Sequence, residues 1–173
     1  MLDGITNFLA KLTKYEWLNV LIPGGVAVVL CRVLSLPAFT AENWFERIVV
    51  YFIWGEIVSR IGAVIIEPMM KSCGMVRFAK YADYIAYSSK NKDEANHLLG
   101  NANLCRTMIA LGLVLFFIRI YYMLPVCGHV RCLTFVLKDI ALLGWSMLFM
   151  AAYCRQVKFI VGRVEEFKKL EGA

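Results

Sequence analysis

Four long apolar stretches alternate with polar segments along the chain. They cover about Trp17 to Leu36, Ile48 to Met70, Thr107 to Val126 and Cys132 to Tyr153. A helix that crosses a bilayer needs about 20 mostly apolar residues, because a rise of about 1.5 Å per residue must span about 30 Å of hydrocarbon. The pattern therefore predicts an all-α integral membrane protein with four transmembrane helices.

Composition agrees with this interpretation. Of the 173 residues, 60% are hydrophobic and 18% are charged, whereas soluble domains are about 45–50% apolar and about 25% charged. An apolar excess of this size needs a bilayer to bury it. It also excludes a disordered chain, a coiled coil and a secreted disulfide scaffold.

Basic residues are distributed unevenly over the polar segments. Most of the 19 Lys and Arg residues lie before the first stretch, between the second and third, or after the fourth. The two short connections contain only Arg47 and Arg131. Because basic segments stay on the cytoplasmic side, both termini and the long middle segment are predicted to be cytoplasmic.

This topology divides the chain into five parts. Leu2, Ile5, Leu9 and Leu12 recur at helical spacing, which predicts an amphipathic helix on the lipid surface. The parts are an interfacial helix (1–16), a first transmembrane hairpin (17–70), a cytoplasmic helical insert (71–106), a second hairpin (107–154) and a cytoplasmic amphipathic tail (155–173). The tail is expected to continue the last span, and either to pack under the bundle or on lipid, or to bind a partner.

Catalytic and metal-binding signatures are absent from the sequence. It contains no GxSxG, HExxH, GxGxxG or Walker loop. His97 and His129 fall on opposite sides of the predicted membrane, so we expect no metal site and no cofactor. Cys127 and Cys132 share a short outer connection, where a disulfide is sterically allowed. The chain is not expected to be an enzyme, although an intramembrane active site built on Glu56, Glu67 or Asp139 stays an alternative.

Ionisable residues interrupt the apolar stretches. Glu56 and Arg60 lie four residues apart, and Glu67 follows seven residues later, so the spacing puts all three roughly on one helix face. The same question arises for Arg119, Lys138 and Asp139. A charge at the bilayer centre costs about 2.5–3.5 kcal/mol on insertion scales. These residues therefore form either an interhelical ion-pair network or the lining of a water-filled path in an oligomer.

The cytoplasmic insert combines basic, aromatic and amide side chains. Cations neutralise phosphates and aromatic rings stack on bases, so this combination suits a single-stranded nucleic acid. The candidate contacts are Arg77, Lys80, Tyr81, Tyr84, Lys90, Lys92, Asn101, Asn103 and Arg106. Two alternatives remain, a helical hairpin that packs the ends of the spans together and a docking surface for a protein partner.

Part of the chain, about residues 48–118, resembles the membrane effectors of the Hailong anti-phage defence system, small four-span proteins of the bacterial inner membrane. The resemblance is carried by Gly55-Glu56, Ser59-Arg60-Ile61-Gly62, Ile66-Glu67-Pro68, Phe78-Ala79, Tyr81, Asp83-Tyr84, Asn101-Ala102-Asn103 and Cys105-Arg106-Thr107. It implies an oligomeric ion channel held closed by single-stranded DNA oligomers that a partner nucleotidyltransferase makes. Loss of that DNA would open the channel, depolarise the cell and abort infection.

The family resemblance supplies no motif that assigns pore or DNA contacts, so the candidate residues rest on their own chemistry. The alternative function is a non-conducting membrane scaffold that recruits a soluble partner.

Overall fold

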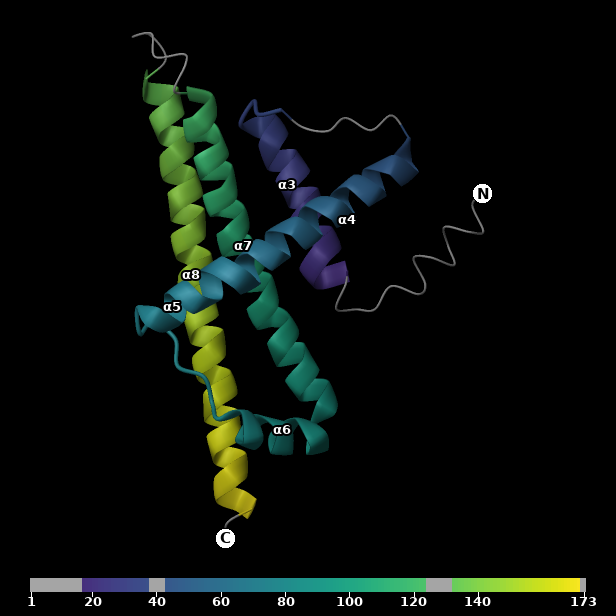
Figure 1. Cartoon of the computed structure of the whole chain (residues 1–173), viewed down its shortest axis with the longest axis vertical. Coiled ribbons are helices and arrows are strands. Elements are labelled where there is room, and N and C mark those ends of the chain that lie inside the picture. Colours follow the sequence, from purple (N-terminus) through teal and green to yellow (C-terminus); the bar gives the residue numbers. More distant parts are fainter. Residues whose placement is uncertain (1–16, 38–42, 124–131, 172–173) are drawn as a thin grey trace.

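The computed structural model describes residues 17–37, 43–123 and 132–171, and these residues form helices with no strand among them (Figure 1). In chain order the elements are the π-helical turn η1 (Trp17–Leu21), α3 (Ile22–Val33), α4 (Trp44–Ile61), the π-helical turn η2 (Gly62–Ile66), α5 (Glu67–Ser72), α6 (Tyr81–Lys90), α7 (Lys92–Met123) and α8 (Cys132–Glu171). The predicted interfacial helix and the side chains of Cys127, His129 and Cys132 lie outside the part that is described.

Three of the described helices are long and apolar enough to cross a membrane, namely Trp44–Ser72, Lys92–Tyr122 and Val136–Leu170. They confirm the all-helical fold class and are consistent with a membrane protein. In the region of the first predicted span, the apolar helix Asn19–Val33 is shorter. Four spans with both termini in the cytoplasm therefore stay a prediction.

The long helices cross one another instead of forming a parallel bundle. α7 and α8 run side by side in opposite directions (Figure 1). α4, η2 and α5 continue as one long helix, called the α4–α5 helix below, which passes obliquely over α7 (Figure 1). α3 packs against α4, and α6 lies across the end where α8 finishes (Figure 1). The core lies where these helices meet, around Val58, Leu111, Leu115 and Tyr153.

α7 and α8 are longer than a bilayer requires. They contain 32 and 40 residues, which at about 1.5 Å per residue is about 48 and about 60 Å of helix. α8 runs unbroken from the last predicted span into the tail, as the sequence predicts. The predicted insert (71–106) differs in one respect, because its residues from Lys92 onward form the beginning of α7. Asn91 ends α6 and separates it from α7.

The crossing of η1 and α3 with α4 depends on two glycines. A Cβ atom on Gly24 would lie 1.6 Å from the Tyr51 carbonyl oxygen, and one on Gly55 would lie 1.8 Å from the Val20 carbonyl oxygen. No side chain fits at either position unless the backbones move apart. Such close contacts at small residues are typical of membrane helices.

Substituting Gly55→Ala is therefore expected to destabilise the protein by about 1–3 kcal/mol, because the new methyl group forces α4 away from Val20. Gly144→Ala in α8 is the matched control, since nothing lies within 4 Å of a Cβ there. Removal of a helical glycine at an open position should stabilise by about 0.5–1 kcal/mol. Thermal unfolding of both variants in detergent tests this, and equal midpoints would contradict the close crossing.

Candidate functional site

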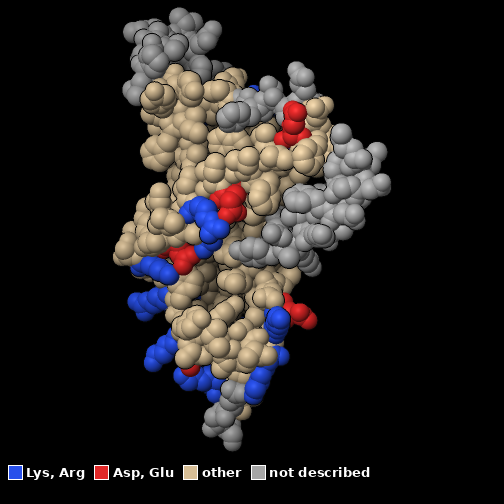
Figure 2. All heavy atoms as spheres, turned by 45° about the vertical axis from the view of Figure 1, so that its right-hand side comes forward, with Lys and Arg blue, Asp and Glu red and all other residues tan. Residues whose placement is uncertain are grey.

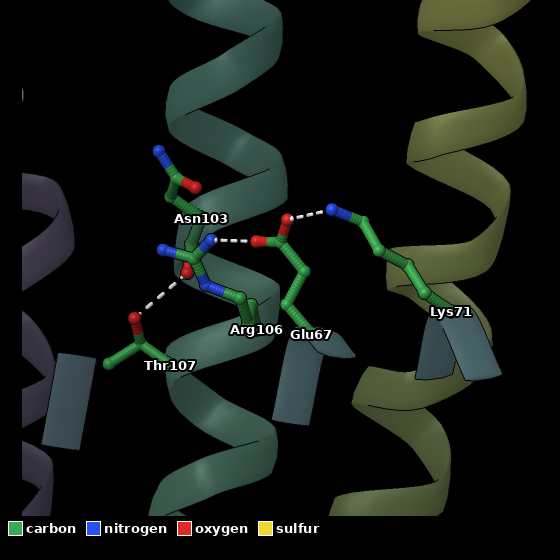
Figure 3. A network of polar contacts seen from close by, with 5 residues as sticks. All are labelled: Glu67, Lys71, Asn103, Arg106 and Thr107. Atoms are coloured by element: carbon green, nitrogen blue, oxygen red, sulfur yellow. Dashed lines mark hydrogen bonds and ion pairs between the residues drawn. The ribbon is translucent and has the colours of Figure 1, made fainter. Parts of the chain in front are cut away.

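A charge network joins α5 to α7 where the α4–α5 helix crosses the bundle (Figure 3). The Glu67 carboxylate lies between two cations, accepting a hydrogen bond from the Arg106 guanidinium and pairing with Lys71 Nζ at 2.9 Å. The Arg106 side chain is only 12% exposed. Beside it, the Thr107 hydroxyl donates to the Asn103 carbonyl oxygen at 2.8 Å. The charge network, defined as Glu67, Lys71 and Arg106, thus ties two helices together at a mostly buried point.

The local geometry of the α4–α5 helix explains why Glu67 reaches α7. A Cβ atom on Gly62 would lie 3.3 Å from the Arg106 carbonyl oxygen, so the two helices are in close contact there. Gly62 is also the first residue of the π-helical turn η2. Because a π-helix has more residues per turn than an α-helix, it rotates the residues after it out of the α-helical register. Glu67 therefore faces α7 and does not share a face with Glu56 and Arg60, which corrects the arrangement that the spacing predicts.

A second group of charges joins α3, α7 and α8. Arg119 Nε and Asp139 Oδ1 are 2.6 Å apart, and the Arg119 side chain is 2% exposed. Arg119 also donates to the Leu34 carbonyl oxygen at 3.3 Å, and Lys138 Nζ donates to the Val33 carbonyl oxygen at 2.9 Å. The last carbonyls of a helix have no partner within it and carry partial negative charge, so two cations here stabilise the end of α3. Arg119–Asp139 is an interhelical ion pair, one of the two alternatives that the sequence offered, whereas Lys138 bonds a backbone carbonyl.

The Glu56–Arg60 pair has a different environment. The two side chains are joined within α4, with Arg60 Nε and Glu56 Oε1 2.7 Å apart. The Glu56 side chain is 38% exposed and the Arg60 side chain is 77% exposed. Neither forms an ion pair with another described residue. The predicted pairing is confirmed, but it does not connect two helices. An ion pair thus lies open on the outer face of an apolar helix of membrane length.

Basic side chains are concentrated where α6 and α8 meet, and we call this region the basic end. Figure 2 shows Lys and Arg side chains gathered over the lower half of the molecule, toward the end of α8, and few charges on the described upper part of that face. A groove of about 440 Å³ lies here between residues 74–77 and α8. Its lining includes Val76, Arg77, Lys158, Val161 and Glu165.

The structure separates the predicted nucleic-acid contacts into two sets. Asn103 is buried, and Arg106 belongs to the charge network, so neither is exposed at the basic end as expected. The remaining residues lie toward that end, namely Arg77, Lys80, Tyr81, Tyr84, Lys90, Lys92 and Asn101. Of these only Arg77 lines the groove.

The aromatic residues of α6 differ in their availability. Tyr81 is 79% exposed and free to stack on a planar group. Tyr84 packs against the small core cluster formed by Tyr87, Ala95 and Val164, and burial raises the pKa of its hydroxyl. Lys90 lies over the Phe167 ring at 5.5 Å from its centroid. α6 thus packs against the core and also exposes the Tyr81 ring to solvent.

Sequence reasoning missed the contribution of α8 to the basic end. Lys158 lines the groove, and Lys168 Nζ pairs with Asp83 of α6 at 3.0 Å. The spacing of Arg155, Lys158, Gly162 and Glu165 places them along one side of a helix and is the signal that was available. Nothing in the sequence alone, however, shows that residues 74–77 lie opposite them.

No group of His, Cys, Asp or Glu side chains in the described parts of the chain is arranged to hold a metal ion. Comparison with protein families, curated proteins and solved structures gives no match for this chain. The functional argument therefore rests on the geometry and the chemistry of the residues.

The charge network predicts unequal effects of its two main partners. Glu67→Leu leaves the mostly buried Arg106 without a carboxylate, and removal of one partner of a buried pair costs about 3–5 kcal/mol. Arg106→Leu should cost less, because Glu67 keeps Lys71. The double substitution should recover most of the loss, since apolar replacement of a whole pair is often neutral. Unfolding midpoints of all three variants in detergent test this, and strictly additive losses would contradict it.

Proposed function

We propose that this protein is an oligomeric membrane effector of bacterial anti-phage defence. In this proposal it forms an ion channel in the bacterial inner membrane, and a nucleic-acid ligand on the cytoplasmic side holds the channel closed. Loss of the ligand opens the channel and depolarises the cell.

The observation that carries the proposal is the open Glu56–Arg60 pair. Ionised groups on a membrane helix are costly in hydrocarbon and usually face other protein or a water-filled cavity. In the part of the chain that the structure describes, no other helix forms an ion pair with Glu56 or Arg60. An oligomer whose α4 helices surround a polar path gives it the environment it needs, and a small chain encloses too little space for a path of its own.

The basic end supports a polyanionic ligand. Arg77 and Lys158 line the groove. Tyr81, which follows Lys80 in the chain, has an exposed aromatic ring. A single-stranded DNA oligomer fits this chemistry, because backbone phosphates need cations and its bases stack on aromatic rings. The resemblance to the Hailong effectors supports the same ligand, with a partner nucleotidyltransferase as its source.

A short path leads from the basic end to the charge network. Lys71 Nζ lies 4.4 Å from the centroid of the Phe78 ring and also pairs with Glu67. The segment that follows α5 is therefore attached both to the groove, through Val76 and Arg77, and to the helix crossing. A ligand that binds better to this arrangement than to a rearranged one would favour the closed state. A ligand with equal affinity for both states could not regulate the channel.

A non-conducting scaffold is the alternative function. The buried pairs Glu67–Arg106 and Arg119–Asp139 favour it, because they show this chain using charged residues to fasten helices together. In that case the exposed pair would serve assembly alone, and the basic end would recruit a soluble partner.

Joint substitution of Glu56→Leu and Arg60→Leu distinguishes the two functions. If the pair lines the path, an apolar lining should dewet the path and reduce ion flux into proteoliposomes to background. The matched control is Glu94→Gln with Arg163→Gln, which removes an exposed pair 3.5 Å apart at the basic end and should leave flux unchanged. Equal flux in both double variants would contradict a path along α4.

Ligand binding is tested on protein purified from cells that also make the partner nucleotidyltransferase. The wild type should carry nuclease-sensitive oligonucleotide, seen in its ultraviolet absorbance ratio. Arg77→Gln with Lys80→Gln should weaken rebinding and reduce the salt slope by about 1.4, since each phosphate contact to a single strand contributes about 0.7. Arg32→Gln, an exposed cation at the end of α3, is the control and should bind normally. Purified wild type without nucleic acid would contradict this ligand.

A further inference from the structure

α4 presents a continuous exposed stripe along its length. Val49, Ile53 and Ile57 are 40%, 51% and 49% exposed. Together with Arg60 they recur at steps of three and four residues, which places them along one side of the helix. We call these four residues, with Glu56 at their edge, the α4 stripe. No neighbour among the residues that the structure describes covers the α4 stripe.

The outer face of α8 provides an instructive contrast. From Ile140 to Leu148 its exposed residues are all apolar or glycine, and Met147 and Leu148 are 66% and 65% exposed. Lipid tails accommodate such a face without cost. The α4 stripe is also exposed, but it carries an ion pair. Of these two faces, only α8 suits lipid as its sole neighbour.

Hydrogen-bonding capacity indicates what covers the α4 stripe. A guanidinium has five N–H donors, and Arg60 directs only Nε and Nη2 toward Glu56. Its side chain is 77% exposed, so further donors point outward. Hydrocarbon offers no acceptor for them, and unsatisfied polar groups in lipid are costly. A partner that supplies a carboxylate for these donors, and a cation for the open side of Glu56, would satisfy both groups.

We infer that the α4 stripe binds the α4 stripe of a second copy, with Glu56 of one copy paired to Arg60 of the next. This inference rests on the proposed oligomeric function and names its contact surface. Copies inserted in one membrane share an orientation, so each stripe presents the same acid and the same base at matching depths. Glu56 and Arg60 differ in height by about 6 Å, four residues at about 1.5 Å each, which the long Arg side chain bridges.

Photo-crosslinking in native membranes tests the contact directly. A photoreactive amino acid at Ile57 should give crosslinked dimers, while the same group at Met147 on α8 should give none. Both positions are apolar and exposed, and the control position is the more accessible of the two, at 66% for Met147 against 49% for Ile57. Crosslinks from Met147 in place of Ile57 would overturn the inference. This comparison leaves Glu56 and Arg60 unchanged. It therefore tests the contact even if charge variants fail to reach the membrane.

Charge reversal separates pairing between copies from pairing within one copy. Glu56→Arg alone and Arg60→Glu alone should each reduce Ile57 crosslinks at least about tenfold, because like charges then meet across the contact. Co-expression of the two variants under different tags should restore crosslinks between tags, since one copy now has two cations and the other two anions. If both variants reach the membrane at the wild-type level and co-expression restores nothing, the pair acts within one copy and the inference is wrong.

The outcome also distinguishes failure of the contact from failure of the proposed channel. Crosslinks measure proximity and not conductance. Ion flux without Ile57 crosslinks would overturn the α4 contact and leave the channel standing. Ile57 crosslinks with heteromeric rescue but without flux would support the contact and count against the channel.

Discussion

The cost of charge in an apolar environment determines how this chain is arranged. Arg119 is almost fully buried, and its position depends on Asp139 and on the carbonyl end of α3. Arg106 is mostly buried and depends on Glu67. Each pair joins different helices, so removal of one charge affects their packing as well as the local polarity. The Glu56–Arg60 pair obeys the same constraint, but no second helix among the described residues pairs with it. A second copy of the chain is the partner that we infer.

Steric detail decides where those charges meet. Close contact at Gly24 and Gly55 sets the crossing of α3 and α4, and Gly62 allows the α4–α5 helix to touch α7. The π-helical turn then directs Glu67 toward Arg106. Because Lys71 and Phe78 follow within the same segment, the crossing is linked to the groove at the basic end. We therefore expect a change in the groove to affect the helix crossing, and a change in the crossing to affect the groove.

The sequence predicted the parts of this structure that depend on periodicity and local spacing. The long apolar helices, the continuity of α8 and the Glu56–Arg60 pair all follow from such patterns. It could not predict which face Glu67 occupies, because a π-helical turn has no reliable sequence signature. Nor could it place Arg106 in the bundle, since a basic residue between polar neighbours looks exposed until a distant carboxylate is brought beside it. The part of the groove that α8 supplies was missed for the same reason.

The central claim is that a ligand at the basic end controls ion conductance. Current recording in planar bilayers, with wild-type protein purified together with its bound nucleic acid, measures this directly. The account predicts little current at first and sustained current after nuclease is added on the side of the basic end, with no response to nuclease on the other side. A bilayer that contains correctly inserted protein and stays silent before and after nuclease would contradict it.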